Sequence, residues 1–146
     1  MSTSLAIRPN PPRAALTALL QSAGLPFDDL ESLGKASFLG LWEGADLVGA
    51  VGLEHFGDSG LLRSLVVAES LRQHQHGSRL LQAMERHARN SGITALYLLT
   101  TDARGYFSKA GYRAVARANA PTAIRSTQQF ARLCPNDAEF MHKPLD

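Results

Sequence analysis

The chain reads LLRSLVVAESLRQHQHGSRLL from residue 61 to residue 81. The first part, Leu61 to Ala68, is rich in Leu and Val and predicts a buried β-strand near the centre of a sheet. A polar loop follows, and Gly77 opens a helix with an apolar side at the helical period. The first N–H groups of a helix lack partners within it and carry the positive end of its dipole. Such a corner between strand and helix binds phosphate readily.

Helices and strands continue in both directions from this segment. The residues before it predict a strand at 5–8, a helix that begins at Pro11-Pro12 and ends at Gly24, and a short helix after Pro26. The residues between 37 and 68 predict an antiparallel meander. Its strands are 37–42, 47–53 or beyond, and 61–68, joined by turns at 43–46 and 57–60.

After the meander the chain alternates between helix and strand. Helices are expected at 77–91, 103–110 and 121–133, and strands at 93–99, 112–117 and 139–145. This alternation implies that part of the sheet is parallel, and the fold class is mixed α/β.

Length, charge and cysteine use limit what the protein can be. The 146 residues are 45% hydrophobic and 19% charged, which predicts a single globular domain over residues 1–146. The net charge of +2 is scattered, so nucleic acid is not an expected partner. Cys134 is alone, and neither a membrane span nor a signal peptide is recognisable, so we expect a cytoplasmic protein without a membrane partner.

Two stretches resemble the general-control-type N-acetyltransferase (GNAT) superfamily. Arg72 and Gly77 match the first and last positions of its pyrophosphate loop, Arg/Gln-x-x-Gly-x-Gly/Ala, while Gln75 replaces the middle glycine. The strand residues Leu65-Val66-Val67 match the family strand whose backbone pairs with pantetheine. Residues 106–112, YFSKAGY, match the aromatic-aromatic-x-x-x-Gly-aromatic signature.

The resemblance implies a fold, a cofactor and an activity. The implied fold is the GNAT-type acyl-CoA N-acyltransferase fold, an α+β arrangement with a central mixed, mostly antiparallel sheet flanked by helices. The implied activity is transfer of acetyl from acetyl-CoA, the co-substrate, to the amine of a small molecule. The residues expected to contact acetyl-CoA are Leu65, Val66, Val67, Arg72, Gln73, His74, Gln75, His76, Gly77, Ser78 and Phe107, and the Arg79 side chain would add a donor to the loop.

A metal is not expected, although His74 and His76 lie two residues apart. Two histidines with no evident third ligand rarely make a closed metal site.

A narrower resemblance covers nearly the whole chain. The segments 49–54, 57–65, 98–101, 120–130 and 133–135 resemble the arsenic-resistance-associated N-acetyltransferases. This implies resistance by acetylation of an amino-acid-like or arsenic-containing toxin. Cys134 itself is a poor arsenic ligand, because soft ions prefer several thiolates.

Amine acetylation needs a base, an oxyanion donor and a proton donor for the leaving thiolate. We expect Glu54 to be the base, with a solvated carboxylate or a pair with Arg63 as the alternatives. The backbone N–H of Val67 is the candidate oxyanion donor. The family's usual thiolate donor is a tyrosine at the position of Phe107, so Tyr106 or solvent would take that role.

Arg63, Ser64 and Thr100 are the candidate acceptor contacts. Arg63 lies among leucines and valines, where a charge is costly unless paired, so it would bind an acidic acceptor or else face outward. Strict alternation predicts that Leu65 shares its face and that Ser64 points the other way. Thr100 or Thr101 is also expected to cap the helix at Ala103. The helix expected at 121–133 would cover the acceptor pocket.

Two other functions remain open from the sequence. Gln75 and Phe107, which depart from the family pattern, favour a CoA-binding regulatory module without turnover. Acetylation of a protein or peptide is the third hypothesis. Because dimers are common in the superfamily, a homodimer is also an option.

Overall fold

The computed structural model describes residues 5–24, 36–68, 76–100, 103–126 and 138–145. In chain order the helices are α1 (Arg13–Ser22), α2 (His76–Asn90), α3 (Arg104–Lys109), the 3-10 helix η3 (Arg117–Asn119) and α4 (Thr122–Arg125). The strands are β1 (Leu5–Pro9), β2 (Ala36–Glu43), β3 (Asp46–Phe56), β4 (Ser59–Val67), β5 (Ala95–Thr100), β6 (Arg113–Ala114) and β7 (Glu139–Pro144).

These strands form one seven-stranded sheet in the order β1-β2-β3-β4-β5-β7-β6. Every neighbouring pair is antiparallel except β4 and β5, which are parallel. The mixed, mostly antiparallel sheet and the β2–β4 meander are therefore confirmed. Gly44 and Gly57 adopt positive φ angles of 61° and 63° in the turns of that meander, a conformation that glycine adopts without steric cost.

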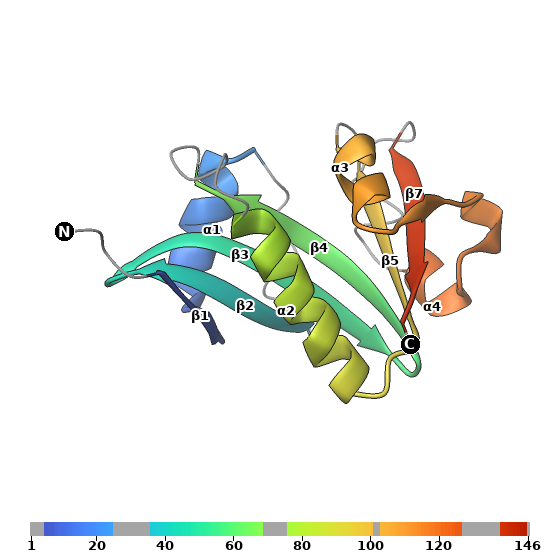
Figure 1. Ribbon diagram of the computed structural model, residues 1–146, viewed down its shortest axis with the longest axis horizontal. Helices are drawn as coiled ribbons and strands as arrows, with labels where there is room; N and C mark the ends of the chain where they lie inside the picture. Colours follow the sequence, from blue (N-terminus) through green and yellow to red (C-terminus); the bar gives the residue numbers. More distant parts are fainter. Residues whose placement is uncertain (1–4, 25–35, 69–75, 101–102, 127–137, 146) are drawn as a thin grey trace.

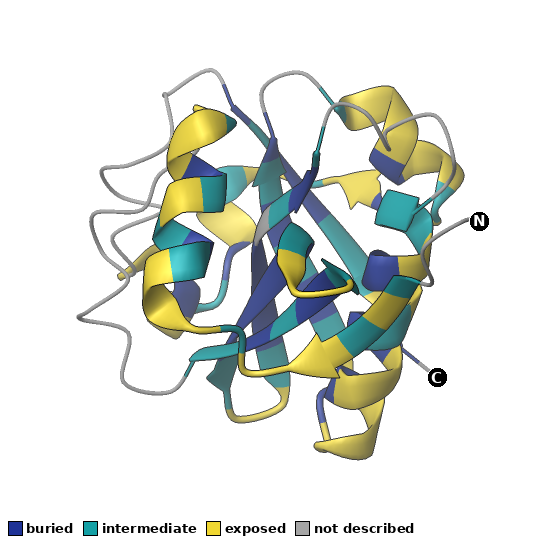
Figure 2. Cartoon of the chain, turned by 90° about the vertical axis from the view of Figure 1, so that its left-hand side faces the viewer, coloured by how far each residue is buried: buried dark blue, intermediate teal, exposed yellow. Residues whose placement is uncertain are grey.

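The helices α1 and α2 cover opposite faces of the sheet (Figure 1). The buried side chains of α2 share an apolar cluster with Val51, whereas those of α1 share another with Ala50. Successive residues of a strand point to opposite faces, so these two neighbours assign one face to each helix. Figure 2 shows the result, with buried residues on the sheet and on the inner sides of the helices.

The strand β4 contains a bulge next to its centre. Gly52 lies opposite Arg63 and Ala50 lies opposite Val66, so Val51 alone faces two residues of β4, Ser64 and Leu65. One extra residue in one strand is a β-bulge, which breaks the alternation of side chains.

The expectation that Leu65 shares a face with Arg63 is consequently wrong. Leu65 packs against the α2 cluster. Arg63 lies on the other face, where its Cγ would be 3.0 Å from a methyl group added at Gly52. The ring of Phe38, a member of the α1 cluster, lies against the same position.

The last third of the chain differs from the sequence expectation in one element. The strand expected at 112–117 is only two residues long, because the chain turns into η3 at Arg117. The guanidinium of Arg117 donates a hydrogen bond of 2.8 Å to Ala138 O, which holds this turn near the start of β7. The helix expected at 121–133 is seen as α4 up to Arg125, and residues 127–137 lie outside the described residues, as does the helix expected after Pro26.

Candidate active site

The sheet opens between its two parallel strands. Residues 59–61 of β4 pair with residues 95–97 of β5, and the ladder stops at Leu61 and Tyr97 although β4 continues to Val67. Figure 1 shows the two strands meeting at one end and spreading apart toward α3. The opening divides the sheet into a first half, β1–β4, and a second half, β5–β7.

A cavity of about 380 Å³ lies between α2 and α3. Its α2 wall consists of Ser78, Leu81, Gln82 and Glu85, which recur at helical spacing and so lie on one side of the helix. The remaining lining residues are Tyr106, Lys109, Ala110 and Lys143. A volume of this size is within the range of ligand pockets.

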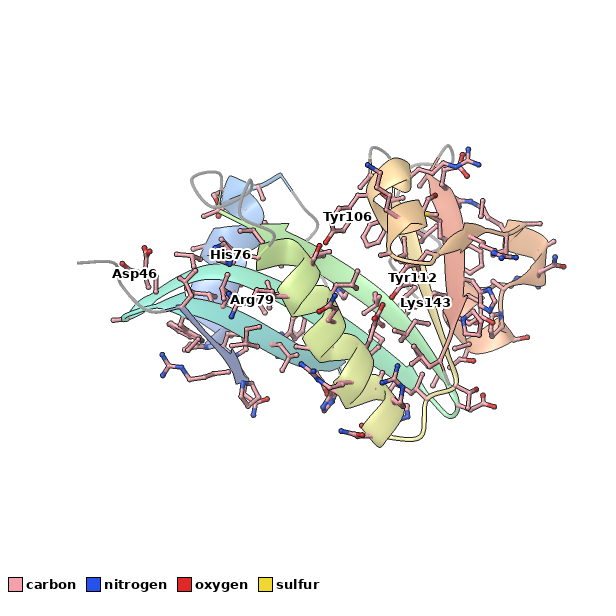
Figure 3. The ribbon with its side chains drawn as sticks, in the orientation of Figure 1. Asp46, His76, Arg79, Tyr106, Tyr112 and Lys143 are labelled. Atoms are coloured by element: carbon pink, nitrogen blue, oxygen red, sulfur yellow. The ribbon has the colours of Figure 1, made fainter. Side chains whose placement is uncertain are left out.

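Four predicted site residues meet at the exposed end of this cavity. Ser78 Oγ and Tyr106 Oη form a hydrogen bond of 3.1 Å between α2 and α3. A methyl group added at Gly77 would lie 3.4 Å from Tyr106 Oη and 3.7 Å from Val67 Cγ2. The expected proton donor, the expected oxyanion strand and the first turn of α2 are therefore adjacent (Figure 3).

Phe107 points into the core rather than into the cavity. Its side chain is buried and belongs to the α2 cluster. The ring makes edge-on contacts with Tyr106 on one side and Tyr112 on the other, at centroid distances of 5.1 and 5.7 Å. Its contact with acetyl-CoA stays a prediction, and its visible role is to support the two tyrosines.

A charged cluster lies at the inner end of the cavity. The Glu85 carboxylate accepts hydrogen bonds from Tyr112 Oη at 2.8 Å and from Lys143 Nζ at 3.1 and 3.2 Å. Burial, and then the charge of Glu85, raise the pKa of the Tyr112 hydroxyl far above its usual range. Tyr112 is therefore a neutral donor at physiological pH.

The cavity carries a net positive charge among its lining residues. Lys143 is neutralised by Glu85, whereas Lys109 makes no ion pair with another described residue. Lys109 lies in the last turn of α3, at the edge of the cavity. This leaves one cation available to an anionic ligand.

Glu54 and Arg63 share the opposite face of the sheet. Glu54 follows Gly52 by two residues in β3, so both face the side on which Arg63 lies. Both charged side chains are buried, with exposed fractions of 8% and 3%. They lie beside Leu61, whose apolar cluster includes Ile124 of α4. The sheet thus separates these two residues from the α2–α3 cavity, except at the opening between β4 and β5.

Thr100 does not cap α3. The N-cap residue of α3 is Ala103, which makes no side-chain cap hydrogen bond, and the buried Thr100 Oγ1 accepts a hydrogen bond of 3.0 Å from the N–H of Ala103 itself. The expected capping by Thr100 is therefore wrong, Thr101 lies outside the described residues, and acceptor binding by Thr100 stays a prediction.

Several predicted residues lie outside the described part of the chain, namely Arg72, Gln73, His74, Gln75, Thr101, Cys134 and the side chain of Ser64. His76 begins α2, and its Nδ1 lies 3.4 Å from Arg79 Nη1.

Sequence reasoning missed Glu85, Lys109 and Lys143. A signal was present for Glu85, because it lies between Met84 and Ala88 on the apolar side of α2, where an acidic residue needs a partner. Lys143 offered a weaker signal, and its proximity to Glu85 depends on tertiary structure.

The described residues contain neither a cluster of metal ligands nor a helix that could cross a membrane. In residues 5–24, 36–68, 76–100, 103–126 and 138–145, no three His, Cys, Asp or Glu side chains gather as metal ligands. Within the same ranges, the helices are too short or too polar to cross a membrane.

Comparison with solved structures shows the fold in other proteins. An acetyltransferase of the GNAT family from Staphylococcus aureus is 19% identical, with a TM-score of 0.80 over 98% of this chain and 100% of that chain. The N-acetylglutamate synthase of Neisseria gonorrhoeae, complexed with coenzyme A and N-acetyl-glutamate, is 22% identical, with a TM-score of 0.78. It covers all of this chain, which spans only 36% of the synthase chain.

A third structure also contains the cofactor. The PaiA N-acetyltransferase of Thermoplasma acidophilum, in complex with coenzyme A, is 15% identical, with a TM-score of 0.71 over 97% of this chain and 99% of that chain. Among curated proteins, none matches this sequence.

The family assignment comes from the sequence itself. The model of the acetyltransferase (GNAT) family matches residues 8–112, which include the α2 wall, Tyr106 and the opening between β4 and β5. The chain belongs to the GNAT family of N-acetyltransferases.

Proposed function

We propose that the protein transfers acetyl from acetyl-CoA to the amine of a small molecule. The observation that carries this proposal is the meeting of Tyr106, Ser78, Gly77 and Val67 where the β4–β5 ladder has ended. That arrangement offers a hydroxyl donor, a helix start and a strand edge around one opening.

The lining residues fit acetyl-CoA. The cavity has an excess of one cation, Lys109, which suits a phosphate group of the cofactor. Its wall also contains Leu81 and Ala110 for the apolar parts of the ligand. Acetyl-CoA supplies the activated acetyl thioester when it is bound.

The residues of the chain would divide the chemistry between the two faces of the sheet. Glu54, on the face opposite the cavity, accepts a proton from the acceptor amine. As the amine nitrogen bonds to the acetyl carbon, the backbone N–H of Val67 would stabilise negative charge on the acetyl oxygen. When the carbon–sulfur bond breaks, Tyr106 would give a proton to the departing sulfur, and Ser78 would orient the Tyr106 hydroxyl through the 3.1 Å contact.

Arg63 is the residue from which we infer the chemical class of the acetyl acceptor. A guanidinium carries five N–H donors in a fixed fork that matches a carboxylate. Arg63 is 3% exposed and shares a face with Glu54, so one residue would hold an acceptor carboxylate while the other takes the amine proton. Amino acids have both groups, and the N-acetyl-glutamate in the Neisseria complex is such an acylated amino acid.

The experiment is a thiol-release assay with acetyl-CoA and a panel of amines. The panel contains amino acids, the same compounds without the carboxylate, an arsenic-containing amino acid, and a peptide. We expect the amino acids to be acetylated and the decarboxylated amines to react much more slowly. Preference for the arsenic compound would assign the protein to arsenic resistance.

Other outcomes would reject the proposal. Peptide acetylation alone would favour a protein substrate. Coenzyme A binding without turnover of any amine would favour the regulatory module, which the hydroxyl-free Phe107 already suggests.

A cytoplasmic location is part of the proposal, because acetyl-CoA and a lone Cys134 suit a reducing compartment. Fractionation of the native host tests it, and recovery outside the cytoplasm would reject it.

A further inference from the structure

The cluster of Glu85, Tyr112 and Lys143 connects elements from both halves of the sheet. Glu85 lies on α2, which packs on β2, β3 and β4. Lys143 lies on β7, and Tyr112 follows α3 immediately before β6. The hydrogen bonds of 2.8 to 3.2 Å therefore cross from the α2 wall to the α3 side of the cavity.

The cluster is internally satisfied, which distinguishes it from a ligand site. Lys143 Nζ has three protons, and the oxygens within its reach are both Glu85 oxygens and Ala110 O at 3.0 Å. Glu85 and Lys143 cancel in charge, and Tyr112 is neutral. The group therefore has little capacity left for a bound anion or cation.

A buried ion pair is also a poor means of gaining stability. Removing two charges from water costs about as much as their attraction returns, and apolar residues of the same size often serve equally well. Apolar packing, however, has no direction, whereas hydrogen bonds require set distances and angles. Such a cluster therefore fixes a geometry more than it adds free energy.

The geometry that it would fix is the distance between α2 and α3. Elsewhere across the opening, the ladder of β4 and β5 holds only residues 59–61 against 95–97. At the exposed end, the described polar contact between the helices is Ser78 to Tyr106. The rings of Tyr112, Phe107 and Tyr106 contact one another in series, so a shift of Tyr112 would be passed to Tyr106.

We propose that Glu85 is a positioning residue: through Lys143 and Tyr112 it sets the width of the cavity and the place of the Tyr106 hydroxyl. The inference rests on the proposed acetyl transfer, since Tyr106 is the proton donor in that function. It assigns to Glu85 a role in cofactor affinity and in proton transfer without any contact with the reacting atoms.

The test compares three variants of the full-length protein. Glu85→Gln keeps the shape and removes the charge, Tyr112→Phe keeps the ring and removes the hydrogen bond, and Lys143→Arg keeps the charge. Leu20→Val is the matched control, because Leu20 is fully buried in the α1 cluster on the other face of the sheet. Unfolding, the calorimetric Kd of coenzyme A, and kcat and KM are measured for each.

We expect Glu85→Gln and Tyr112→Phe to weaken coenzyme A binding roughly tenfold, a typical coupling within a contact network. The comparison is made at about 1 M salt, because Glu85→Gln leaves Lys143 without its ion-pair partner and salt screens the extra attraction of Lys143 for a phosphate. Lys143→Arg should stay near wild type, and Leu20→Val should lose stability without losing affinity. In combination with Tyr106→Phe, the Glu85→Gln effect on kcat should largely disappear, because the two changes act on one proton transfer.

Two results would overturn the inference. One is that Glu85→Gln and Leu20→Val lose the same free energy of unfolding and also bind coenzyme A with the same Kd. The other is full additivity of Glu85→Gln and Tyr106→Phe in kcat. Should Glu85→Gln fail to fold, Tyr112→Phe decides the affinity comparison. A wild-type protein that binds coenzyme A without turnover would reject the proposed function, and the affinity comparison would still decide the role of Glu85.

Discussion

Single residues decide whether the site can do chemistry, and Tyr106 is the first to consider. The family motif has a tyrosine at the position where this chain has Phe107, and the hydroxyl of Tyr106 lies one position earlier in the helix. Neighbours on a helix point about 100° apart, so α3 places Tyr106 in the cavity lining and Phe107 in the core. Under the proposed function, Tyr106 would therefore take the role that the family gives to the tyrosine at the position of Phe107.

Tyr106→Phe should therefore lower kcat by about 10²-fold, the lower range for a lost general acid, with little change in coenzyme A affinity. The ring packing on Phe107 is kept, so the loss reports on the hydroxyl alone. Steady-state kinetics with calorimetry measure both quantities, and Tyr97→Phe is the control, since Tyr97 stacks on Phe140 away from the cavity. A kcat in Tyr106→Phe equal to that of wild type would assign proton donation to solvent.

Tyr112 gives a prediction about pH. Burial, and then the Glu85 charge, raise its pKa well above the usual tyrosine value of about 10, so the folded state resists deprotonation. The stabilising contribution is complete below the unfolded pKa, and it is lost as the pH rises above about 10 toward the folded pKa. Between pH 9 and pH 11, the free energy of unfolding should fall more steeply in wild type than in Tyr112→Phe. Parallel curves from denaturant titrations would mean that Tyr112 is ionised equally in both states.

At the scale of elements, the turns and helix ends could be predicted from the sequence, whereas the register between neighbouring strands could not. Gly44, Gly57, Gly92 and Gly111 have positive φ angles and mark turns or helix ends that composition already indicated. The bulge at Ser64 and Leu65 has no comparable local signal, because it depends on how β3 pairs with β4. The assignment of Arg63 and Leu65 to one face failed for that reason.

The same limit applies to the site. The residues at the start of α2 and in the aromatic motif could be named because they resemble the motifs of a known family. Glu85 and Lys143 are 58 residues apart in the chain, and only the packing of α2 beside β7 brings them together. Pairing of this kind is tertiary information, which a period-based reading of one sequence does not contain.

Gly52 gives a prediction at the level of two paired strands. Its Cα faces the Phe38 ring and the Arg63 stem, and an added methyl group would lie 2.5 Å and 3.0 Å from their nearest atoms. Gly52→Ala should destabilise the protein by about 1–3 kcal/mol through overpacking. It should also raise the acceptor KM, because the arginine would have to move.

The matched control is another glycine in a described element. Gly105 in α3 has no atom within 4 Å of an added methyl group, so Gly105→Ala should be neutral or stabilising by up to about 1 kcal/mol. Denaturant unfolding of both variants checks the comparison. A Gly52→Ala protein as stable as Gly105→Ala would show that β3 adjusts to the added methyl without strain.

For the whole molecule, coenzyme A bound at the opening between the two halves of the sheet would raise the free energy of unfolding. A ligand that binds only the folded state stabilises it by RT ln(1 + [L]/Kd), about 2.7 kcal/mol at a hundredfold excess over Kd. Coenzyme A would contact α2 and α3 together, so the gain should appear in one cooperative unfolding transition. Two unfolding transitions that coenzyme A stabilises to different extents would mean that the ligand binds to one half of the sheet alone.

Under the proposed function, Lys109 should determine how coenzyme A binding depends on salt. It is the lining cation without an ion pair among the described residues, so a phosphate near it would lose part of its attraction as the ionic strength rises. Lys109→Gln should therefore weaken coenzyme A binding several-fold in low salt, and the difference from wild type should shrink toward 1 M salt, where the screening length is about 3 Å. Arg113→Gln is the control, because Arg113 is an exposed cation on β6 outside the cavity lining. If Lys109→Gln and Arg113→Gln bind coenzyme A with the same Kd at every salt concentration, the phosphates of the cofactor lie elsewhere, and the α2–α3 cavity accommodates at most the uncharged part of the ligand.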